Sequence, residues 1–364
     1  ELLTGVQKMF MPFTAWIGEV RHTSTLRADI IAGITVALVL VPQSMAYAQL
    51  AGLPPYIGLY ASFIPVMIAA FMGSSRQLAT GPVAVVSLLT AASLAPLAGG
   101  NAELYLALAA MLAIMVGVFQ ILLGVFRLGV LVDFLSHPVV VGFTNGAAII
   151  IATSQLSKIF GVSVEKAAHH YETVWRVVVA AGQDTHMLTL LMGIFALAIM
   201  ILMKKFTPKI PNVLTAVVVT TLISWWFDFQ AAGGKVVGEV PQGLPGITLP
   251  DFDMPLVLKL ATAAVTIALI GFMEAIAIAK AMAAQTRQRL DTNQELFGQG
   301  LSNVTSGLFG AYPVSGSFSR SAVNIAAGAQ TGFSSVVTGG VVAITLLFLT
   351  PLLYHLPQAT LAAV

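Results

Sequence analysis

The chain has 364 residues, of which 57% are hydrophobic and 9% are charged, with a net charge of +2 and no cysteine. A soluble protein carries about 25% charged residues, so this composition excludes a soluble fold and favours a surface that faces lipid. The net charge is too small to argue for a nucleic-acid partner, and the basic residues form no stripe. The lack of cysteine excludes disulfides and thiolate metal sites.

Long stretches without charge predict where the chain crosses the bilayer, because a spanning helix needs about 20 apolar residues. No stretch alternates like the strands of a membrane barrel, so we predict an all-α polytopic membrane protein. Residues 1–28 carry charges throughout and are predicted to be a cytoplasmic segment, and residues 29–364 a single transmembrane domain. The predicted helices cover residues 30–50, 55–73, 82–96, 103–125, 129–154, 186–203, 210–228, 256–282, 292–310, 318–328 and 332–351, with another starting at 357.

The distribution of basic residues predicts the orientation of the chain. With a cytoplasmic N-terminus, 11 Lys and Arg fall in inner segments and 5 in outer segments, which is the excess expected on the cytoplasmic side. The outer set is Lys158, Lys166, Arg176, Lys235 and Lys259. The apolar residues 9–13 and Trp16 indicate either a helix on the cytoplasmic membrane surface or an ordinary leader.

Two segments rich in small and polar residues interrupt the spanning pattern. The first, 76–86, offers Thr80 as an N-cap and Pro82 in the first helical turn, positions that suit both residue types. The second, 312–321, contains Gly, Pro, four Ser and Arg320. Interrupted segments in the two halves of a transporter mark its binding site, because helix N-termini attract anions. The alternative is a pair of re-entrant kinks without a ligand.

Two charged residues stand within apolar stretches. Arg320 would cost about 2.5–3.5 kcal/mol in lipid, so we expect it to face protein or water and to add its charge to a helix N-terminus. Glu274 shares a helix face with the small residues Gly271, Ala277 and Ala281. A desolvated carboxylate exchanges a proton near neutral pH, which makes Glu274 a candidate proton relay. The structural alternative is a permanent ion pair between Glu274 and Arg320.

Other polar residues are less informative. Gln43 and Tyr47 lie four apart on one face of the first span, and buried polar groups of this kind either bond neighbouring helices or line a cavity. Asn303-Val304-Thr305 fits the glycosylation pattern but falls in a predicted span, and Gly298-Gln299-Gly300 follows no strand, so neither is a functional motif. No nucleophile–base pair stands out, so the sequence predicts no enzyme, no catalytic or metal site and no cofactor.

A series of motifs resembles the SulP (sulfate permease) anion transporters, from about residue 25 to the end. In chain order the motifs are VPQSMAYA (41–48), LPP (53–55), GLY (58–60), GSSR (73–76), TGPVAVVSL (80–88), NQEL (293–296), GQGL (298–301) and GSFSRSAVN (316–324). These motifs in this order are specific to the family.

The resemblance implies fourteen segments in two inverted repeats of seven, divided into core and gate domains. The third and tenth segments would be half-helices whose N-termini flank the anion, starting here at Gly81 and Ser319. The chain as given would end within segment twelve, ahead of two more segments and a cytoplasmic STAS domain. The residues implied to border the substrate are Gln43, Tyr47, Val83, Ser319 and Arg320, to which we add Thr80 and Gly81 at the first half-helix. Glu274 would hold the position of the coupling residue.

The predicted function is secondary active transport of a small inorganic anion. The SFSRSAVN and GSSR motifs are similar to plant-type sulfate carriers, and Glu274 to proton-coupled members, which favours proton–sulfate uptake by an elevator-type mechanism. Carriers or exchangers of bicarbonate, chloride or dicarboxylate remain alternatives, as does an anion channel or voltage-driven motor. A nucleobase–proton symporter of the same architecture would carry a second carboxylate in place of Arg320. We expect a homodimer in a bacterial inner membrane, with lipid, the anion and a proton as partners and no nucleic acid.

Overall fold

The computed structural model describes residues 9–134 and 137–364, except the side chains of 132–134, 137 and 140. Within it the chain forms two compact units. Unit 1 comprises Glu1–Val140 and Leu244–Ile344, and unit 2 comprises Val141–Gly243 and Thr345–Val364. Because each unit takes segments from both halves of the sequence, this division corresponds to the expected core and gate domains.

Unit 1 repeats one order of elements in its two halves. Each half has helices, then a three-residue strand, then a short helix separated from the strand by at most two residues. The first half contains α2 (Thr14–Ile17), a 3-10 turn (Glu19–Arg21), α3 (Thr23–Leu50), α4 (Pro55–Ala61), α5 (Ile64–Met72), β1 (Ala79–Gly81), α6 (Ala84–Ala98), α7 (Ala102–Val125) and a 3-10 helix (Leu128–Phe134). The second contains α13 (Met254–Thr286), α14 (Thr292–Leu308), β2 (Ser315–Ser317), α15 (Phe318–Ala326) and α16 (Phe333–Ile344).

Unit 2 is built from helices of more varied length. Its elements are α8 (His137–Ser154), most of which belongs to this unit, α9 (Leu156–Phe160), α10 (His170–Asp184), α11 (Met187–Phe206), α12 (Asn212–Trp226), a π-helix (Thr345–Leu349), a 3-10 helix (Thr350–Leu353) and α17 (Gln358–Ala363). In the described parts of both units together, six helical segments are long and apolar enough to cross a membrane. They are Thr23–Leu50, Pro55–Met72, Ala102–Val125, Met187–Phe206, Met254–Thr286 and Phe333–Leu353.

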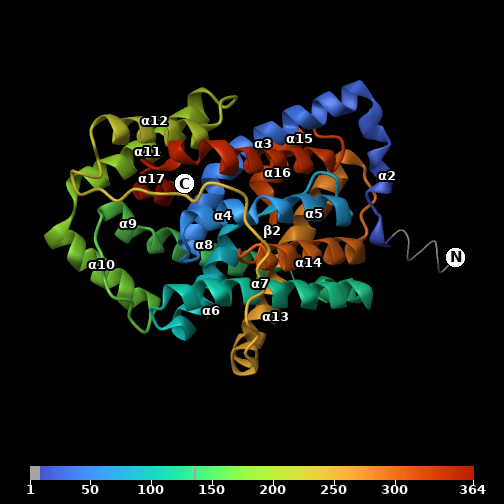
Figure 1. Cartoon of the computed structure of the whole chain (residues 1–364), viewed down its shortest axis with the longest axis horizontal. Coiled ribbons are helices and arrows are strands. Elements are labelled where there is room, and N and C mark those ends of the chain that lie inside the picture. Colours follow the sequence, from blue (N-terminus) through green and yellow to red (C-terminus); the bar gives the residue numbers. More distant parts are fainter. Residues whose placement is uncertain (1–8, 135–136) are drawn as a thin grey trace. The chain divides into compact units, whose positions relative to one another are not determined.

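Small residues let α7 and α14 lie side by side (Figure 1). A methyl group added at Gly300 would lie 2.7 Å from the backbone oxygen of Gly117, and one at Gly307 would lie 2.4 Å from that of Ala110. Lipid tails are as apolar as leucine, so close backbone packing of this kind, rather than the hydrophobic effect, holds membrane helices together. Helix α5 packs on α14, and α6 and α13 pack on α7.

Several predicted boundaries were wrong. The predicted helix 55–73 is interrupted at Ser62 and Phe63, and a new helix starts at Ile64 with Pro65 in its first turn, a position that suits proline. The first helix begins at Thr23 rather than 30, since it buries the carboxylate of Asp29 completely. The predicted helix 129–154 is a 3-10 helix followed by α8. The amphipathic α10 was not predicted, because a search for uncharged spans passes over a helix that carries charges.

The N-terminal segment packs against the helix bundle. The Trp16 side chain is 4% exposed and its ring stacks on that of Phe71 with centroids 5.9 Å apart. The ring of Phe13 meets the same phenylalanine edge to face at 5.6 Å. The sequence predicted either a helix on the membrane surface or an ordinary leader. The segment contains a four-residue helix, α2, and packs on α5 through these rings.

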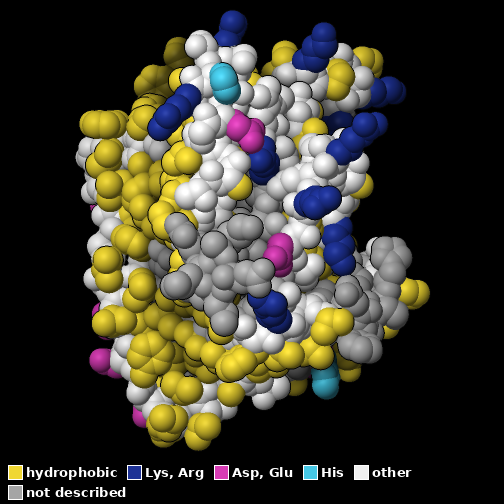
Figure 2. Space-filling model, turned by 90° about the vertical axis from the view of Figure 1, so that its right-hand side faces the viewer, with side chains coloured by type: hydrophobic (Ala, Val, Ile, Leu, Met, Phe, Trp, Pro, Cys, Tyr) yellow, Lys and Arg dark blue, Asp and Glu magenta, His cyan; other side chains and the backbone are white. Residues whose placement is uncertain are grey.

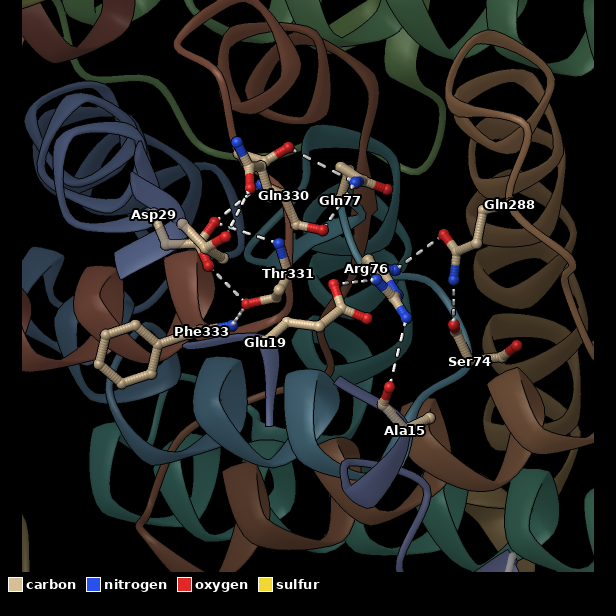
Figure 3. Close-up of polar contacts among 12 residues, drawn as sticks. Ala15, Glu19, Asp29, Ser74, Arg76, Gln77, Gln288, Gln330, Thr331 and Phe333 are labelled. Carbon is tan, nitrogen blue, oxygen red and sulfur yellow. Dashed lines mark hydrogen bonds and ion pairs between the residues drawn. The ribbon is translucent and has the colours of Figure 1, made fainter. Parts of the chain in front are cut away.

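Polar contacts gather the turns at one face of unit 1 (Figure 3). The Asp29 carboxylate accepts hydrogen bonds from the backbone N–H groups of Gln330 (2.8 Å) and Thr331 (3.1 Å), and so ties α3 to the turn after α15. The Gln288 side chain bridges to the turn before β1, through the Arg76 N–H (3.2 Å) and the Ser74 oxygen (2.8 Å).

The same face carries an ion pair between Arg76 and Glu19, 2.9 Å apart. Both partners are partly exposed, so the pair adds about 0–1 kcal/mol to stability at most.

Figure 2 shows Lys and Arg side chains scattered over one face of the molecule, beside a broad area of hydrophobic side chains. A charged strip next to an apolar surface is the pattern expected where a protein leaves the membrane.

Candidate functional site

The two interrupted segments meet inside unit 1 as an antiparallel pair of strands. Ala79 of β1 pairs with Ser317 of β2, Thr80 with Gly316, and Gly81 with Ser315. All six residues are buried. Each strand leads into a short helix: α15 begins directly after β2, and α6 begins after two intervening residues that follow β1. The sheet therefore fixes two helix N-termini in the interior of one unit. The interruptions in the sequence predicted the two half-helices but not the strands that precede them.

Helix α13 packs directly on β2. The Ser315 hydroxyl donates to the backbone oxygen of Gly271 at 2.6 Å, and a methyl group at Gly316 would lie 3.1 Å from the Cα of Ala275. Glu274 precedes that alanine and is half-buried. The sequence predicted a small-residue face made of Gly271, Ala277 and Ala281, but Ala277 and Ala281 are exposed. The buried small residues of α13 near Glu274 are Gly271, Ala275 and Ala279.

The helix starts differ from those predicted. Helix α6 begins at Ala84, with Val83 as an extended N-cap that offers no side-chain hydrogen bond. Thr80 is therefore not the cap, because three residues of extended chain separate it from the helix. Helix α15 begins at Phe318, with Ser317 as N-cap: its hydroxyl accepts from the N–H of Arg320 at 3.4 Å. Ser319 is exposed, with its hydroxyl 3.3 Å from that of Ser317.

Arg320 joins three elements at the start of α6. Its side chain is fully buried, one terminal nitrogen donates to Gln43 Oε1 and the other to the Pro82 oxygen, both at 2.8 Å. Neither of these partners is Glu274. The Nε–H of Arg320 has no hydrogen-bond partner in the described part of the chain. The guanidinium thus places a full positive charge beside the first turn of α6.

Gly81 makes room for this guanidinium. Its φ of +153° suits glycine, and a methyl group there would lie 3.2 Å from a terminal nitrogen of Arg320. A side chain at this position would be both strained and too close. The structure therefore brings the predicted residues Gly81 and Arg320 together through backbone conformation rather than through a side-chain contact.

The other predicted residues surround this point to different degrees. Gln43 is 8% exposed, and because its carbonyl faces Arg320 its NH2 group is left to donate elsewhere. Tyr47 is partly buried and close enough to Arg320 for an electrostatic interaction. Val83 is 8% exposed at the start of α6. Thr80 points away, toward α14, where its hydroxyl accepts from Gln299 at 2.8 Å.

A polar stripe on α14 supports the site and was missed by the sequence analysis. The stripe comprises Glu295, Gln299 and Asn303, spaced by four and all buried. The Glu295 carboxylate accepts from the N–H groups of Ser74 and Ser75, each at 2.8 Å, and from Gln299 at 3.2 Å. Gln299 also holds Thr80, so the stripe links the turn before β1 to the strand itself. The spacing of four between its members is the signal that would have revealed it, because residues four apart share one face of a helix.

Asn303 fixes the approach to β2. Its Oδ1 accepts from the Val314 N–H at 2.7 Å, and its Nδ2 donates to the Val314 oxygen at 3.1 Å and to Gln120 Oε1 at 2.9 Å. The side chain is fully buried. The motif dismissed as a chance glycosylation sequence is therefore a structural clamp.

We expect Asn303→Leu to destabilise unit 1 by several kcal/mol. The substitution keeps the volume but leaves buried groups of Val314 and Gln120 unpaired, and each such group costs about 1–3 kcal/mol. Thermal unfolding of the purified protein in detergent measures the effect. Thr305→Val, two residues along the same helix and only half-buried, is the matched control and should change little. Equal midpoints for the two variants would contradict the clamp.

The first turn of α6 has the properties of an anion site. The first N–H groups of a helix have no intrahelical partner, and here no side chain caps them. The positive end of the helix dipole and the nearby guanidinium act in the same direction. In a buried setting of low dielectric these charges act strongly over several ångströms.

These features together define the inverted-repeat transporter fold, in which two half-helices meet at the binding site. The family model described as the sulfate permease family matches residues 26–364. The chain therefore belongs to the sulfate permease family.

Individual relatives agree with this assignment. The chloroplastic sulfate transporter 4.1 of Arabidopsis thaliana is 42% identical over 363 residues, 97% of this chain and 52% of the relative. The chain thus spans about half the length of the curated relatives it matches. Among solved structures, the murine Solute Carrier 26 family member A9 anion transporter is 26% identical with a TM-score of 0.91, covering 97% of this chain and 62% of that one. The transmembrane domain of a cyanobacterium bicarbonate transporter, BicA, is 27% identical with a TM-score of 0.85, covering 94% and 87%.

Proposed function

We propose that this protein carries a small inorganic anion across the membrane by secondary active transport, and that the anion binds at the N-terminus of α6. The observation that carries the proposal is the buried guanidinium of Arg320 beside an uncapped half-helix N-terminus. Placing an arginine inside a membrane costs free energy, so the arginines found there usually face protein or water and belong to a functional site. The anion would accept hydrogen bonds from the first-turn N–H groups, from the Gln43 amide and from Ser319.

Sulfate is the proposed substrate. The relative with the reported 42% identity is a sulfate transporter, and the motif 316–324 resembles plant-type sulfate carriers. Bicarbonate is the second candidate, supported by the likeness to the BicA transmembrane domain. Chloride, dicarboxylate, or a channel or motor activity would use the same site, and the test below separates the chloride carrier and the channel from the sulfate carrier.

Proton coupling through Glu274 is part of the proposal. The half-buried carboxylate lies on α13, next to the residue that packs against β2, so its charge is felt at the strands that present both half-helices. Protonation would remove a negative charge near the anion and favour its binding. A proton and an anion would then cross together.

The movement we propose is of the elevator type. Unit 1 contains both strands, both half-helices, Arg320 and Glu274, so the whole site belongs to one compact body that can move without being taken apart. We further propose a homodimer in a bacterial inner membrane with the N-terminus in the cytoplasm. Cysteine labelling from each side of the membrane, at positions 22 and 169, would test the orientation.

Uptake of radiolabelled sulfate into proteoliposomes, with and without an imposed pH gradient, tests the function. We expect saturable uptake that is faster when the outside is acidic and is competed by unlabelled sulfate. Uptake competed by bicarbonate or chloride but not by sulfate would reassign the substrate. Flux that never saturates would favour a channel.

We expect Val83→Phe to select against sulfate. Val83 stands at the start of α6, so a larger side chain narrows the space that the anion shares with the helix N-terminus. Sulfate transport should fall by about tenfold or more, the effect of about 1.4 kcal/mol, while the smaller chloride loses less. The ratio of sulfate to chloride uptake is the measurement, with Val83→Ile as the control. An equal loss for both anions would contradict the placement of Val83 at the site.

A further inference from the structure

The N-terminal segment has an exposed side as well as the side that packs on α5. From Phe13 to Arg21 the backbone stays helical, because Gly18 joins α2 to the 3-10 turn in the helical region of backbone angles. Side chains three or four residues apart therefore share a side. The exposed residues with this spacing are Thr14, Ile17 and Arg21. This side thus offers an apolar and a cationic side chain to the surroundings.

Helix α3 carries a second exposed stripe directly after this segment. Its members, again three or four residues apart, are Arg27, Ile30, Ile31, Ile34 and Leu38. The helix is long and apolar enough to cross a membrane, so we expect the apolar members to face acyl chains. Arg27 lies about one helical turn, about 5 Å, before the first of them, a level from which its long side chain reaches lipid headgroups. The exposed side chains of residues 14–31 are called the N-terminal surface below.

The charge left on the N-terminal surface is positive. Its two carboxylates are both committed to other parts of unit 1: Glu19 pairs with Arg76 at 2.9 Å, and the fully buried Asp29 accepts hydrogen bonds from the turn after α15. Arg21 and Arg27 are exposed, and neither forms an ion pair within the described part of the chain. The surface therefore presents two guanidinium groups beside exposed isoleucines, with no carboxylate to neutralise them.

Contacts on the inner side hold the N-terminal surface in place. The Gln294 side chain donates to the Met9 oxygen at 3.0 Å, and the Trp16 ring stacks on that of Phe71. A methyl group at Gly332 would lie 3.0 Å from the same tryptophan ring, so the ring fills the space beside the turn after α15. The surface is pre-organised by these contacts, which lowers the entropic cost of binding a partner.

We propose that the N-terminal surface binds the headgroups of anionic phospholipids. Arg21 and Arg27 would meet the phosphates, for which the planar guanidinium offers paired hydrogen bonds, while Ile17 and Ile31 lie among the first acyl carbons. Exposed apolar side chains next to basic ones are the pattern of segments that lie in a membrane interface. The partner is lipid rather than a soluble protein because the apolar stripe of α3 continues into the membrane-spanning part of that helix. The inference goes beyond the proposed transport function and holds whichever anion is carried.

Quenching by spin-labelled lipids tests which lipid lies at this surface. The chain has no cysteine, so Thr14→Cys provides a single position for a fluorophore on the exposed side. The labelled full chain is placed in phosphatidylcholine nanodiscs that contain the same small fraction of either spin-labelled phosphatidylglycerol or spin-labelled phosphatidylcholine. We expect the phosphatidylglycerol to quench about fivefold more strongly, the enrichment that about 1 kcal/mol from one basic residue gives.

Arg21→Gln/Arg27→Gln in the same labelled chain should make the two lipids quench equally. Both side chains are exposed, so the variant should fold, and each single substitution should lose part of the preference. Lys166→Gln/Arg176→Gln is the matched control, because it removes two exposed positive charges from unit 2, and it should keep the full preference.

Three results would overturn the proposal. Equal quenching by the two lipids before any arginine is replaced would show that the surface does not select anionic headgroups. No quenching by either lipid would place the surface away from the membrane. A preference that millimolar inorganic phosphate removes would assign the arginines to a soluble anion instead of a lipid.

Discussion

Sulfate binding at α6, and uptake with it, is expected to fall by about 10- to 100-fold when Arg320 is replaced by Gln. The guanidinium supplies a full positive charge beside a helix N-terminus that no side chain caps. A hydrogen bond or close contact with a charged group is worth about 1.5–3 kcal/mol, and 2.7 kcal/mol corresponds to about 100-fold in affinity. Dialysis in nanodiscs measures binding and proteoliposome uptake measures transport.

Arg320→Lys is the matched control for this result. Lysine keeps the charge but cannot reach Gln43 and Pro82 with two nitrogens at once, so we expect affinity between those of the other two proteins. Size-exclusion profiles of both variants check folding, since the side chain is fully buried. A folded Arg320→Gln variant with unchanged sulfate affinity would mean that the anion binds elsewhere.

The sequence was enough to predict the main features of unit 1. Uncharged stretches located the long helices, because lipid tolerates few charges, and breaks in that pattern located both half-helices. The cost of a charge in the membrane singled out Arg320. Arg320 donates a hydrogen bond to Gln43, the polar residue that the sequence singled out on the first span.

What failed depends on contacts between segments distant in the sequence. Strands β1 and β2 have three residues each, and neither shows a strand pattern; they exist because 79–81 and 315–317 pair across more than 200 residues. The caps shifted for the same reason: the pairing extends the chain past Thr80, so α6 begins later than its local signals suggest.

Polar residues were misjudged when each was considered alone. Asn303 was considered as a glycosylation site and Gln299 as part of a nucleotide loop, yet with Glu295 they form one stripe on α14 that holds the turn before β1, strand β1 and the approach to β2. A short-range motif has no means of showing this. Periodicity along the whole helix does, because buried polar side chains must share a face with their partners.

Glu274→Gln is expected to separate exchange from coupled uptake. Glutamine has nearly the shape of a protonated glutamate but cannot release a proton. If Glu274 carries the coupling proton, the rate of sulfate-for-sulfate exchange across the proteoliposome membrane should stay within about twofold of the unmodified protein, because the loss of proton release need not alter sulfate binding. Uptake driven by a pH gradient should disappear. Both rates are measured on the same preparation, and Glu274→Asp, which still titrates, should keep part of the coupling.

A purely structural role for Glu274 leads to a different result. If the carboxylate is one partner of a permanent buried ion pair, removing it leaves an uncompensated charge that costs about 3–5 kcal/mol, and Glu274→Gln should express poorly and unfold early in detergent. Its position supports the coupling role, because the side chain is only half-buried and lies next to the β2 contact rather than in the packed core. A stable Glu274→Gln protein that kept full pH-driven uptake would contradict both roles, and the search for the coupling group would then move to Glu295, a fully buried carboxylate linked through Gln299 to β1.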